Sequence, residues 1–270
     1  MELRDRVTVV TGAAGGIGAA LCRAFHDEGA AVVCSDVRAE GVEALAASLN
    51  AARAGSALGV AADISTEAAN VALIRAAEEH FGPIDLFFAN AGIAAGTLLE
   101  ETDEETWQAA FAVNLHAHRF AAKHLVPGWL ARGEGYFCST ASAAGLLSQI
   151  GSAPYSVTKA AAVAFADWLS ITYGSRGVLV SCLCPQGVNT DMLRQGDDPG
   201  AGPASGVVRS AGEVLEPSVV ADIVVEAIRD ERFLILPHPE VAEFMRRKAS
   251  DRDRWLAGMR KLQASVTGRW

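Results

Sequence analysis

Short apolar runs alternate with helix-like segments along most of the sequence, and this alternation constrains the fold more than any other feature. The runs do not alternate polar with apolar residues, as expected for strands buried on both faces. They cover Val7–Val10, Ala31–Ser35, Ala57–Val60, Ile84–Ala89, Gly135–Cys138, Val178–Cys184 and Phe233–Leu236. Candidate helices lie between them, over Gly16–Glu28, Ala39–Asn50, Thr66–Phe81, Glu104–Arg132, Tyr155–Tyr173 and Pro217–Glu231. This order predicts an α/β fold with a doubly wound, seven-stranded parallel sheet and helices on both faces.

No composition shift divides the chain, so residues 1–270 are expected to form a single domain. One interval, about 190–216, is rich in Gly, Pro, Ala and Asp and has no strong period. It follows a predicted strand, so we interpret it as a substrate lid, with a disordered surface insertion as the alternative. The last segment, about 239–270, predicts an amphipathic helical tail with Trp255 and Trp270, which docks on the same domain or on a neighbouring subunit.

The composition excludes several classes of protein. A formal net charge of −9 disfavours nucleic acid as a partner, because phosphate binding needs a basic face. No run of 18 residues is continuously apolar, so no membrane span is expected. The five cysteines show no metal-ligand spacing, and neither do the histidines, so no metal site is predicted. An odd cysteine count without a secretion signal favours a cytoplasmic location.

A glycine-rich turn follows the first expected strand, in Thr11-Gly-Ala-Ala-Gly-Gly-Ile-Gly18, and a helix begins there. Gly12 permits a tight turn, Gly16 lets the backbone approach a pyrophosphate, and Gly18 lets the helix meet the strand. The free N–H groups and the dipole of the helix N-terminus then face the phosphates. Because strand, loop and helix occur in the required order, the segment predicts a dinucleotide site rather than a plain turn.

The second expected strand ends in Val33-Cys-Ser-Asp36, about 20 residues beyond the glycine turn. An acid at this place hydrogen-bonds the adenosine ribose hydroxyls and repels a 2′-phosphate. The glycine turn contains no basic residue that could hold such a phosphate. Both features favour NAD over NADP. Arg38 leaves NADP open, because an arginine just past this strand could meet a 2′-phosphate or could be an ordinary surface residue.

Tyr155 and Lys159 lie four positions apart at the start of an expected helix, so they share one helix face. A phenol with a pKa of about 10 then lies close to an ammonium group. The positive charge favours phenolate and is expected to draw the phenol pKa toward neutrality. Such a pair can serve as a general acid and base.

Together these motifs resemble the short-chain dehydrogenase/reductase family over nearly the whole chain. The glycine pattern at Thr11–Gly18 and the Tyr-x-x-x-Lys at Tyr155–Lys159 are the family's two best signatures, and they lie about 140 residues apart here. The resemblance implies a single-domain Rossmann fold. It also implies a set of cofactor-binding residues: Gly12, Ala14, Gly16, Ile17, Gly18, Asp36, Val37, Asp63, Ile64, Asn90, Ala91, Gly92, Tyr155, Lys159, Pro185, Gly187, Val188 and Thr190. Without it, Asp63 is equally an ordinary turn or helix-cap residue.

The resemblance also implies the catalytic residues Asn114, Ser142, Tyr155 and Lys159. Ser142 stands thirteen positions before Tyr155 and ahead of x-Ala-Gly, as in the family, and leaves Ser139 and Thr140 as hydrogen-bonding residues at a strand end. In this scheme Tyr155 takes the alcohol proton while hydride passes to the nicotinamide. Ser142 hydrogen-bonds the substrate oxygen. Asn114, which is a poor helix former in mid-helix, holds a proton-relay water.

Two places depart from the family pattern. Ala89 precedes Asn90 where a second Asn is usual, a change that bears on the support of the sheet. In Cys184-Pro-Gln-Gly-Val-Asn-Thr190, Gln186 replaces the usual glycine and could point into the substrate pocket. The expected substrate-contacting residues are mostly apolar: Ser142, Ala144, Leu147, Tyr155, Gln186, Met192 and Leu193, with Leu146 and Ile150 nearby.

The sequence therefore predicts an NAD-dependent oxidoreductase that interconverts a hydrophobic secondary alcohol and its ketone. An NADP-dependent 3-ketoacyl reductase is an alternative, disfavoured by Asp36 and the acidic charge. A nucleotide-sugar epimerase or dehydratase is another, which usually has a different glycine spacing. A non-catalytic NAD-binding sensor or scaffold should have lost Tyr155, Lys159 or Ser142, and this chain keeps all three. By resemblance, the protein is expected to be a homotetramer or homodimer.

Overall fold

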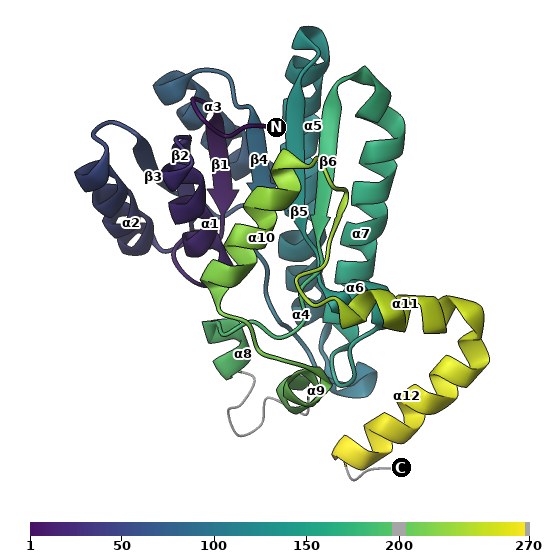
Figure 1. Ribbon diagram of the computed structural model, residues 1–270. Coiled ribbons are helices and arrows are strands. Elements are labelled where there is room, and N and C mark those ends of the chain that lie inside the picture. Colours follow the sequence, from purple (N-terminus) through teal and green to yellow (C-terminus); the bar gives the residue numbers. More distant parts are fainter. Residues whose placement is uncertain (196–203, 268–270) are drawn as a thin grey trace.

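The computed structural model describes residues 1–195 and 204–267, and contains a seven-stranded parallel sheet (Figure 1). The strands lie in the order β3-β2-β1-β4-β5-β6-β7, and all six pairings are parallel. Their bounds are Val7–Thr11 (β1), Ala31–Asp36 (β2), Ala57–Ala61 (β3), Leu86–Ala89 (β4), Gly135–Thr140 (β5), Val178–Leu183 (β6) and Leu234–Ile235 (β7). The predicted doubly wound fold is confirmed.

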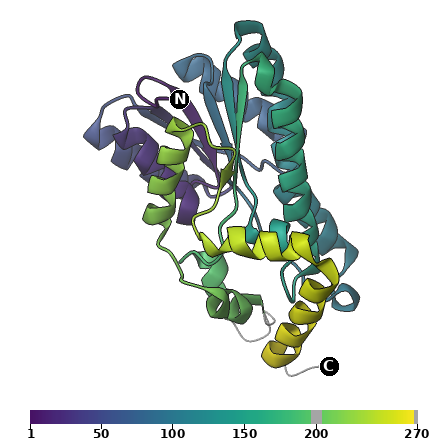
Figure 2. The same cartoon turned by 45° about the vertical axis from the view of Figure 1, so that its right-hand side comes forward.

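Helices cover both faces of this sheet (Figures 1 and 2). One face packs against α1 (Gly16–Asp27), α2 (Ala39–Ala52) and α10 (Pro217–Arg229). The other packs against α3 (Glu67–Phe81), α5 (Ala117–Arg132) and α7 (Ala153–Tyr173). Each layer completes its own apolar core, and the sheet separates the two.

Strand residues point alternately into these two cores. In β4, Leu86 and Phe88 belong to the core under α1, whereas Phe87 and Ala89 belong to the core under α5. Both faces need apolar side chains, which is why the strands read as continuous apolar runs. The strand expected over Ile84–Ala89 is shorter in the structure, where β4 begins at Leu86. The Ile84 carbonyl instead accepts a hydrogen bond from the side chain of Trp129, Nε1 to O, at 2.7 Å.

The expected helix over Glu104–Arg132 is not regular. It consists of α4 (Glu104–Phe111), a π-helical turn over Ala112–His116 and α5. The π-helical turn contains Asn114, and such turns are frequent at functional sites. A shorter helix, α6 (Ala143–Leu147), follows β5, and 3₁₀ turns cover Leu99–Glu101 and Gly174–Arg176.

The expected lid interval contains two short helices, α8 (Asp191–Gln195) and α9 (Ala204–Ala211). Its middle, 196–203, lies outside the described residues. The expected helical tail consists of α11 (Glu240–Ser250) and α12 (Arg252–Thr267), which we call the arm; Trp270 lies outside the described residues. α12 turns away from the body at Asp251 (Figures 1 and 2). Of the described helices, none combines the length and apolarity that crossing a bilayer requires.

The strand order reverses between β1 and β4: the sheet extends from β1 through β2 to β3 on one side, and from β4 through β5 and β6 to β7 on the other. In open α/β sheets, ligands bind at such a switch point, beyond the carboxyl ends of the strands. The glycine turn, Asn90, Ser142 and the Pro185–Thr190 segment all follow strands at this edge. The fold therefore gathers the predicted site residues at one place.

Candidate active site

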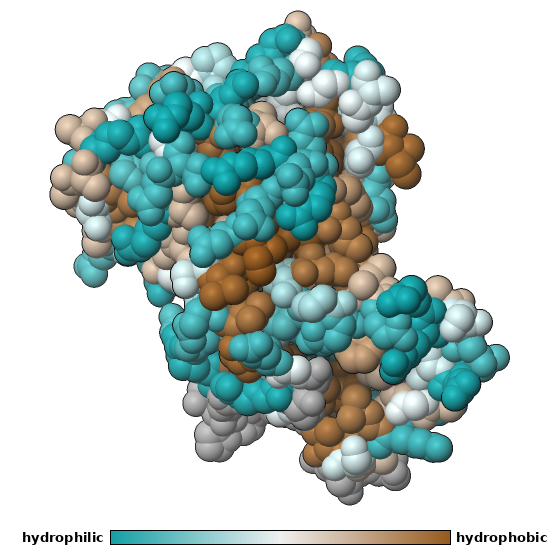
Figure 3. Space-filling view, viewed as in Figure 1, coloured by the Kyte–Doolittle hydropathy of each residue, from teal (hydrophilic) through white to brown (hydrophobic). Residues whose placement is uncertain are grey.

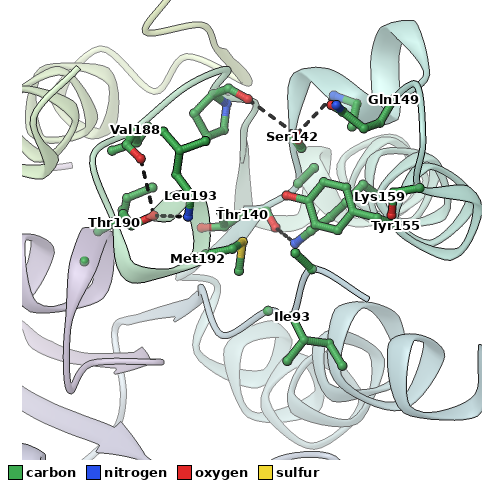
Figure 4. Close-up of a pocket in the computed structure, with 18 of the residues that line it drawn as sticks. Ile93, Thr140, Ser142, Gln149, Tyr155, Lys159, Val188, Thr190, Met192 and Leu193 are labelled. Carbon is green, nitrogen blue, oxygen red and sulfur yellow. Dashed lines mark hydrogen bonds between the residues drawn. The ribbon is translucent and has the colours of Figure 1, made fainter. Parts of the chain in front are cut away.

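A cavity of about 1280 Å³ lies at this edge of the sheet and reaches to the arm (Figure 4). Sixteen of the eighteen residues predicted to bind the cofactor line it; Ala14 and Gly187 do not. All seven predicted substrate residues line it, together with Ile150, while Leu146 does not. One space thus holds both sets of predicted residues, and the apolar set lies on the side toward the arm.

The glycine turn has the backbone shape that its sequence predicts. Gly12 has a φ of +68°, which side-chain-bearing residues rarely adopt. A Cβ atom at Gly18 would lie 2.1 Å from the Gly12 carbonyl oxygen, so only glycine lets α1 approach β1 this closely. The turn therefore leaves its backbone open to the cavity rather than covered by side chains.

Asp36 lies at the end of β2 with its side chain only 10% exposed. Its Oδ2 accepts a hydrogen bond from the Ala14 N–H at 3.1 Å, and its Oδ1 accepts one from the Arg38 N–H at 3.1 Å. Arg38 Nε lies 3.4 Å from the same Oδ1. Ala14 thus does not line the cavity but bonds the Asp36 carboxylate through its N–H. Arg38 is bound to the same carboxylate.

Thr11 and Asn90 join the ends of β1, β4 and β5. The Thr11 hydroxyl accepts hydrogen bonds from the N–H groups of Asn90 and Ala91, both at 3.0 Å. Asn90 Nδ2 donates to the Thr11 carbonyl at 2.9 Å, and its Oδ1 accepts from the Thr140 hydroxyl at 3.0 Å. This network supports the strand ends, with Ala89 buried in the core beside it.

Ser142 is the N-cap of α6, where its Oγ accepts a hydrogen bond from the Ala144 N–H at 3.0 Å. The same hydroxyl lies 3.4 Å from the Pro185 carbonyl, to which it can donate. Ser139 and Thr140 act as strand-end hydrogen-bonding residues: Ser139 Oγ lies 2.9 Å from His118 Nδ1, and Thr140 bonds Asn90. Of these three residues only Ser142 and Thr140 line the cavity.

Lys159 is 2% exposed, and its ammonium donates to the Thr140 carbonyl at 2.9 Å (Figure 4). Burial lowers the pKa of Lys159 from 10.5 to about 8. Beneath it, burial and the Lys159 charge lower the pKa of His118 to about 3, so this imidazole is neutral. Lys159 and His118 thus both lie where burial disfavours a positive charge.

Tyr155 points into the cavity between Ser142 and Lys159 (Figure 4). Burial raises the pKa of its phenol, and a hydrogen bond with the Ser142 hydroxyl lowers it in part. The expectation that Lys159 draws the pKa of the phenol toward neutrality is wrong for this arrangement. The ammonium lies over the ring face, 5.7 Å from its centroid, and turns toward Thr140 instead.

Asn114 is fully buried and fixes the segment that follows Asn90-Ala-Gly92. Its Oδ1 accepts from the Ile93 N–H at 2.9 Å, and its Nδ2 donates to the Ile93 carbonyl at 3.0 Å and to Thr158 Oγ1 at 3.1 Å. It does not line the cavity. A Cβ atom at Gly92 would lie 3.1 Å from Lys159 Nζ and 3.2 Å from Asn114 Oδ1, so both atoms face this glycine.

The Pro185–Thr190 segment crosses the cavity and is held from behind by His238. The Gln186 N–H donates to His238 Nδ1 at 3.2 Å, while His238 Nε2 lies 3.2 Å from the Gly187 carbonyl. Gly187 faces Val208 and Val214 rather than the cavity. The Thr190 hydroxyl lies 3.3 Å from the Val188 carbonyl (Figure 4).

Sequence reasoning did not place the arm at the cavity and did not single out His238, which supports Gln186. Phe244, Trp255, Met259 and Leu262 line the cavity from α11 and α12. The spacing of three to four residues between Trp255, Met259 and Leu262 marks one face of α12, but it does not say what that face covers. Asp63, left open from the sequence, accepts a hydrogen bond from the Ser65 N–H at 3.1 Å, as a turn residue does, and it also lines the cavity.

Comparison with known proteins agrees with this geometry. The family model described as short chain dehydrogenase matches residues 6–199. A cis-4-hydroxycyclohexanecarboxylate dehydrogenase of Sinomonas cyclohexanicum is 36% identical over 70% of this chain and 76% of that protein. A 1-deoxy-11-beta-hydroxypentalenate dehydrogenase of Streptomyces exfoliatus is 35% identical over 93% of this chain and 90% of that protein.

A crystal structure of a short chain dehydrogenase/reductase from Burkholderia phymatum in complex with NAD has a TM-score of 0.84 to this chain. It is 31% identical, and the match covers 94% of this chain and 96% of that one. The chain belongs to the short-chain dehydrogenase family. It is accordingly an oxidoreductase that binds a nicotinamide cofactor. The residues fit that group, because Gly12, Gly15, Gly16 and Gly18 line the cavity without a side chain.

Proposed function

We propose that this protein interconverts a hydrophobic secondary alcohol and its ketone with NAD as the redox cofactor. The observation that carries the proposal is the convergence of Ser142, Tyr155 and Lys159 on one cavity that is also lined by the glycine turn and Asp36. The two relatives described above are named for dehydrogenation of hydroxy compounds, which supports the same reaction class. An NADP-dependent 3-ketoacyl reductase is disfavoured by the held carboxylate of Asp36.

Each residue of this group has a distinct task in the proposed reaction. Tyr155 Oη removes the proton from the alcohol oxygen in oxidation and returns it in reduction. Ser142 Oγ hydrogen-bonds that oxygen and holds it as its charge changes. Lys159, whose pKa lies near 8, supplies and takes up the proton that passes through Tyr155. NAD, when bound, supplies the hydride acceptor.

Further residues would hold the cofactor and carry protons. Asp36 accepts hydrogen bonds from the adenosine ribose, and the glycine turn with Gly16 and Ile17 faces the phosphates. Val188 and Thr190 hold the carboxamide end, and Asn114 keeps Oδ1 near Lys159 for a relay water. The remaining proposed cofactor contacts come from the sequence resemblance: Val37, Asp63, Ile64, Asn90, Ala91, Gly92 and Pro185.

A panel of secondary alcohols with NAD and with NADP tests the proposal directly. We expect NAD-linked oxidation of alicyclic or other hydrophobic secondary alcohols, followed by the absorbance of the reduced nicotinamide. Cofactor binding without turnover on every alcohol of the panel would favour the sensor or scaffold alternative instead. Turnover with NADP alone would contradict the cofactor assignment.

The pH dependence of the reaction should follow the Tyr155–Lys159 pair. Burial lowers the pKa of Lys159 to about 8 and raises that of Tyr155, so the pair loses its first proton near pH 8. Below this pH the Lys159 ammonium can supply a proton through Tyr155 to a ketone, whereas above it the neutral Lys159 amine can take up the proton that Tyr155 accepts from an alcohol. We therefore expect kcat/KM to rise through about pH 8 for oxidation and to fall through the same pH for reduction.

Both profiles are measured by initial rates with saturating NAD or NADH in buffers of constant ionic strength. Rates of oxidation that stay level from about pH 6 to pH 10 would contradict a role for this pair in proton transfer.

Asp36→Ser should shift cofactor selectivity toward NADP. The substitution removes the carboxylate that repels a 2′-phosphate and releases Arg38, which now lies 3.4 Å from Asp36 Oδ1. We expect the ratio of kcat/KM for NADP to that for NAD to rise by about tenfold to a hundredfold, or about 1.4 to 2.7 kcal/mol. Glu40→Gln, an exposed acid on the first turn of α2, is the matched control and should leave the ratio unchanged. An unchanged ratio in Asp36→Ser would refute the role of Asp36.

The protein is further proposed to be cytoplasmic and to form a homotetramer or homodimer through its long helices. Exposed apolar side chains on α7 support this assembly, since Ile171 is 82% exposed and Trp168 is 52% exposed. Monomeric proteins rarely leave several large apolar side chains uncovered on one helix. The expected lid, with Met192 and Leu193 on the cavity wall, is proposed to cover the substrate.

A further inference from the structure

A second cavity, of about 330 Å³, opens beside the first one between the body and the arm. The two share a wall: Leu147, Gln149, Ile150, Trp255 and Met259 line both of them. The side of α12 that faces the body carries apolar surface (brown in Figure 3). A molecule bound at Ser142 and Tyr155 can therefore extend along apolar walls into the second cavity.

Two adjacent faces of α12 line the two cavities. Trp255, Met259 and Leu262 lie at a spacing of three to four residues and line the first cavity. Arg252, Leu256 and Arg260 follow at a spacing of four and line only the second. The helix thus presents an apolar face to the reacting end of a substrate and a basic face to its far end.

The wall of the second cavity is basic without compensation. Among the described residues that line it, three are cationic (Lys248, Arg252 and Arg260) and none is acidic. This is unexpected in a chain with 32 acidic and 23 basic residues. Charge of a single sign on the wall of a cavity attracts a ligand of the opposite sign.

Glu243 and Asp251 of the arm are engaged elsewhere. Glu243 pairs with Arg246 at 2.6 Å and with Arg247 at 2.8 Å, on the preceding part of α11. Asp251 Oδ1 accepts a hydrogen bond from the Arg254 N–H at 2.9 Å. These acids therefore cannot be the partners of the cations in the second cavity without giving up contacts that they already make.

Lys248 and Arg252 lie close enough to repel each other. Lys248 Nζ donates to the Leu146 carbonyl at 2.5 Å, which fixes the ammonium at the rim. Burial and the charge of Arg252 lower the pKa of Lys248. Within residues 1–195 and 204–267, neither Arg252 nor Arg260 forms an ion pair. An anion in this cavity would relieve the repulsion and satisfy the free guanidinium groups.

We propose that the second cavity binds a carboxylate at the far end of the substrate, so that the natural substrates are hydrophobic hydroxy acids. The alcohol lies at Ser142 and Tyr155, the hydrocarbon body lies against Trp255 and Met259, and the carboxylate meets Arg252 and Arg260. This inference rests on the proposed function for the position of the alcohol. It adds the polarity and the orientation of the substrate, which the catalytic residues alone do not determine.

A series of hydroxy fatty acids measures the distance between the two sites. Each member carries a secondary alcohol on its penultimate carbon and a carboxylate at the other end, and its methyl ester is the uncharged partner. For the wild-type protein with NAD, we expect the acid to exceed its ester in kcat/KM by about fivefold at the chain lengths that span both cavities. The preference should vanish for shorter acids and weaken as the salt concentration rises.

The double variant Arg252→Gln/Arg260→Gln tests the residues. Both side chains are exposed, so the fold should be retained. We expect the variant to raise KM for the acid by about fivefold and to leave KM and kcat for the ester unchanged. Arg246→Gln is the matched control, because Arg246 lies on the same arm, pairs with Glu243 and lines neither cavity.

Calorimetric titration of the same acids and esters into the NAD-bound protein separates this inference from the proposed function. Acid binding that the double variant weakens supports the carboxylate site even if no member of the series is oxidised, an outcome that would count against the proposed reaction. Oxidation of acid and ester with equal KM would support the reaction and overturn the carboxylate site. So would equal binding of acids by the wild type and the double variant.

Discussion

Replacing Tyr155 by Phe should lower kcat for alcohol oxidation by about a thousandfold, because positioned general acids and bases contribute about a hundredfold to ten-thousandfold. The substitution removes only the phenol oxygen, the proposed proton acceptor, and keeps the ring that packs beneath the Lys159 ammonium. Binding of NAD should be retained within about twofold, because the glycine turn and Asp36 are untouched. Steady-state rates and a fluorescence titration with NADH measure the two quantities separately.

Tyr173→Phe is the control for this substitution. Tyr173 ends the same helix, where its ring packs edge-on against Trp168 far from the cavity wall, and it should retain full activity. Undiminished kcat in Tyr155→Phe would remove Tyr155 from the reaction. Loss of NADH binding together with kcat would show that the tyrosine acts through the cofactor site rather than through the proton.

Gly18→Ala should weaken both the fold and the cofactor site. The new Cβ atom would lie 2.1 Å from the Gly12 carbonyl oxygen and 2.8 Å from Asn90 Nδ2. Backbone must move to relieve the first contact, and overpacking of this kind costs about 3 kcal/mol. Because the movement displaces the turn itself, we expect NAD affinity to fall by about a hundredfold as well. Chemical denaturation and NADH titration give the two values.

Gly128→Ala, in α5, should raise the stability of the protein, in contrast to Gly18→Ala. No atom lies within 4 Å of a Cβ added at Gly128, and the residue is inside α5. Alanine there should stabilise the protein by about 0.5 to 1 kcal/mol, without an effect on NAD binding. If Gly18→Ala unfolds at the same denaturant concentration as the wild type, the close approach of α1 to β1 is not the reason for this glycine.

The fold was predictable because its strands are buried on both faces. Continuous apolar runs such as β4 can only be central strands, and the segments between them have helical spacing. The glycine turn was predictable for a related reason, since Gly12 and Gly18 occupy places that no other residue tolerates. Positions of this kind can be recognised in a sequence because their backbone geometry admits only glycine.

Other parts of the site depend on contacts between distant segments and leave no such signal. The bond from Lys159 to the Thr140 carbonyl decides which way the ammonium turns, and sequence spacing alone predicted the wrong effect on the pKa of Tyr155. His238 supports Gln186 from more than fifty positions away. The π-helical turn contains Asn114, whose side chain bonds the backbone of Ile93, a contact between distant segments that helix periodicity does not reveal.

The buried ammonium of Lys159 also has a consequence for stability. Its pKa falls from 10.5 to about 8 on folding, so between these pH values the unfolded chain binds more protons and the free energy of unfolding rises with pH. Below pH 8 the buried charge of Lys159 lowers the free energy of unfolding by the full amount, about 3 kcal/mol. Selection for thermal resistance alone would therefore tend to discard the residue on which turnover is proposed to depend. The residue proposed to be needed for turnover is thus also one that destabilises the folded protein.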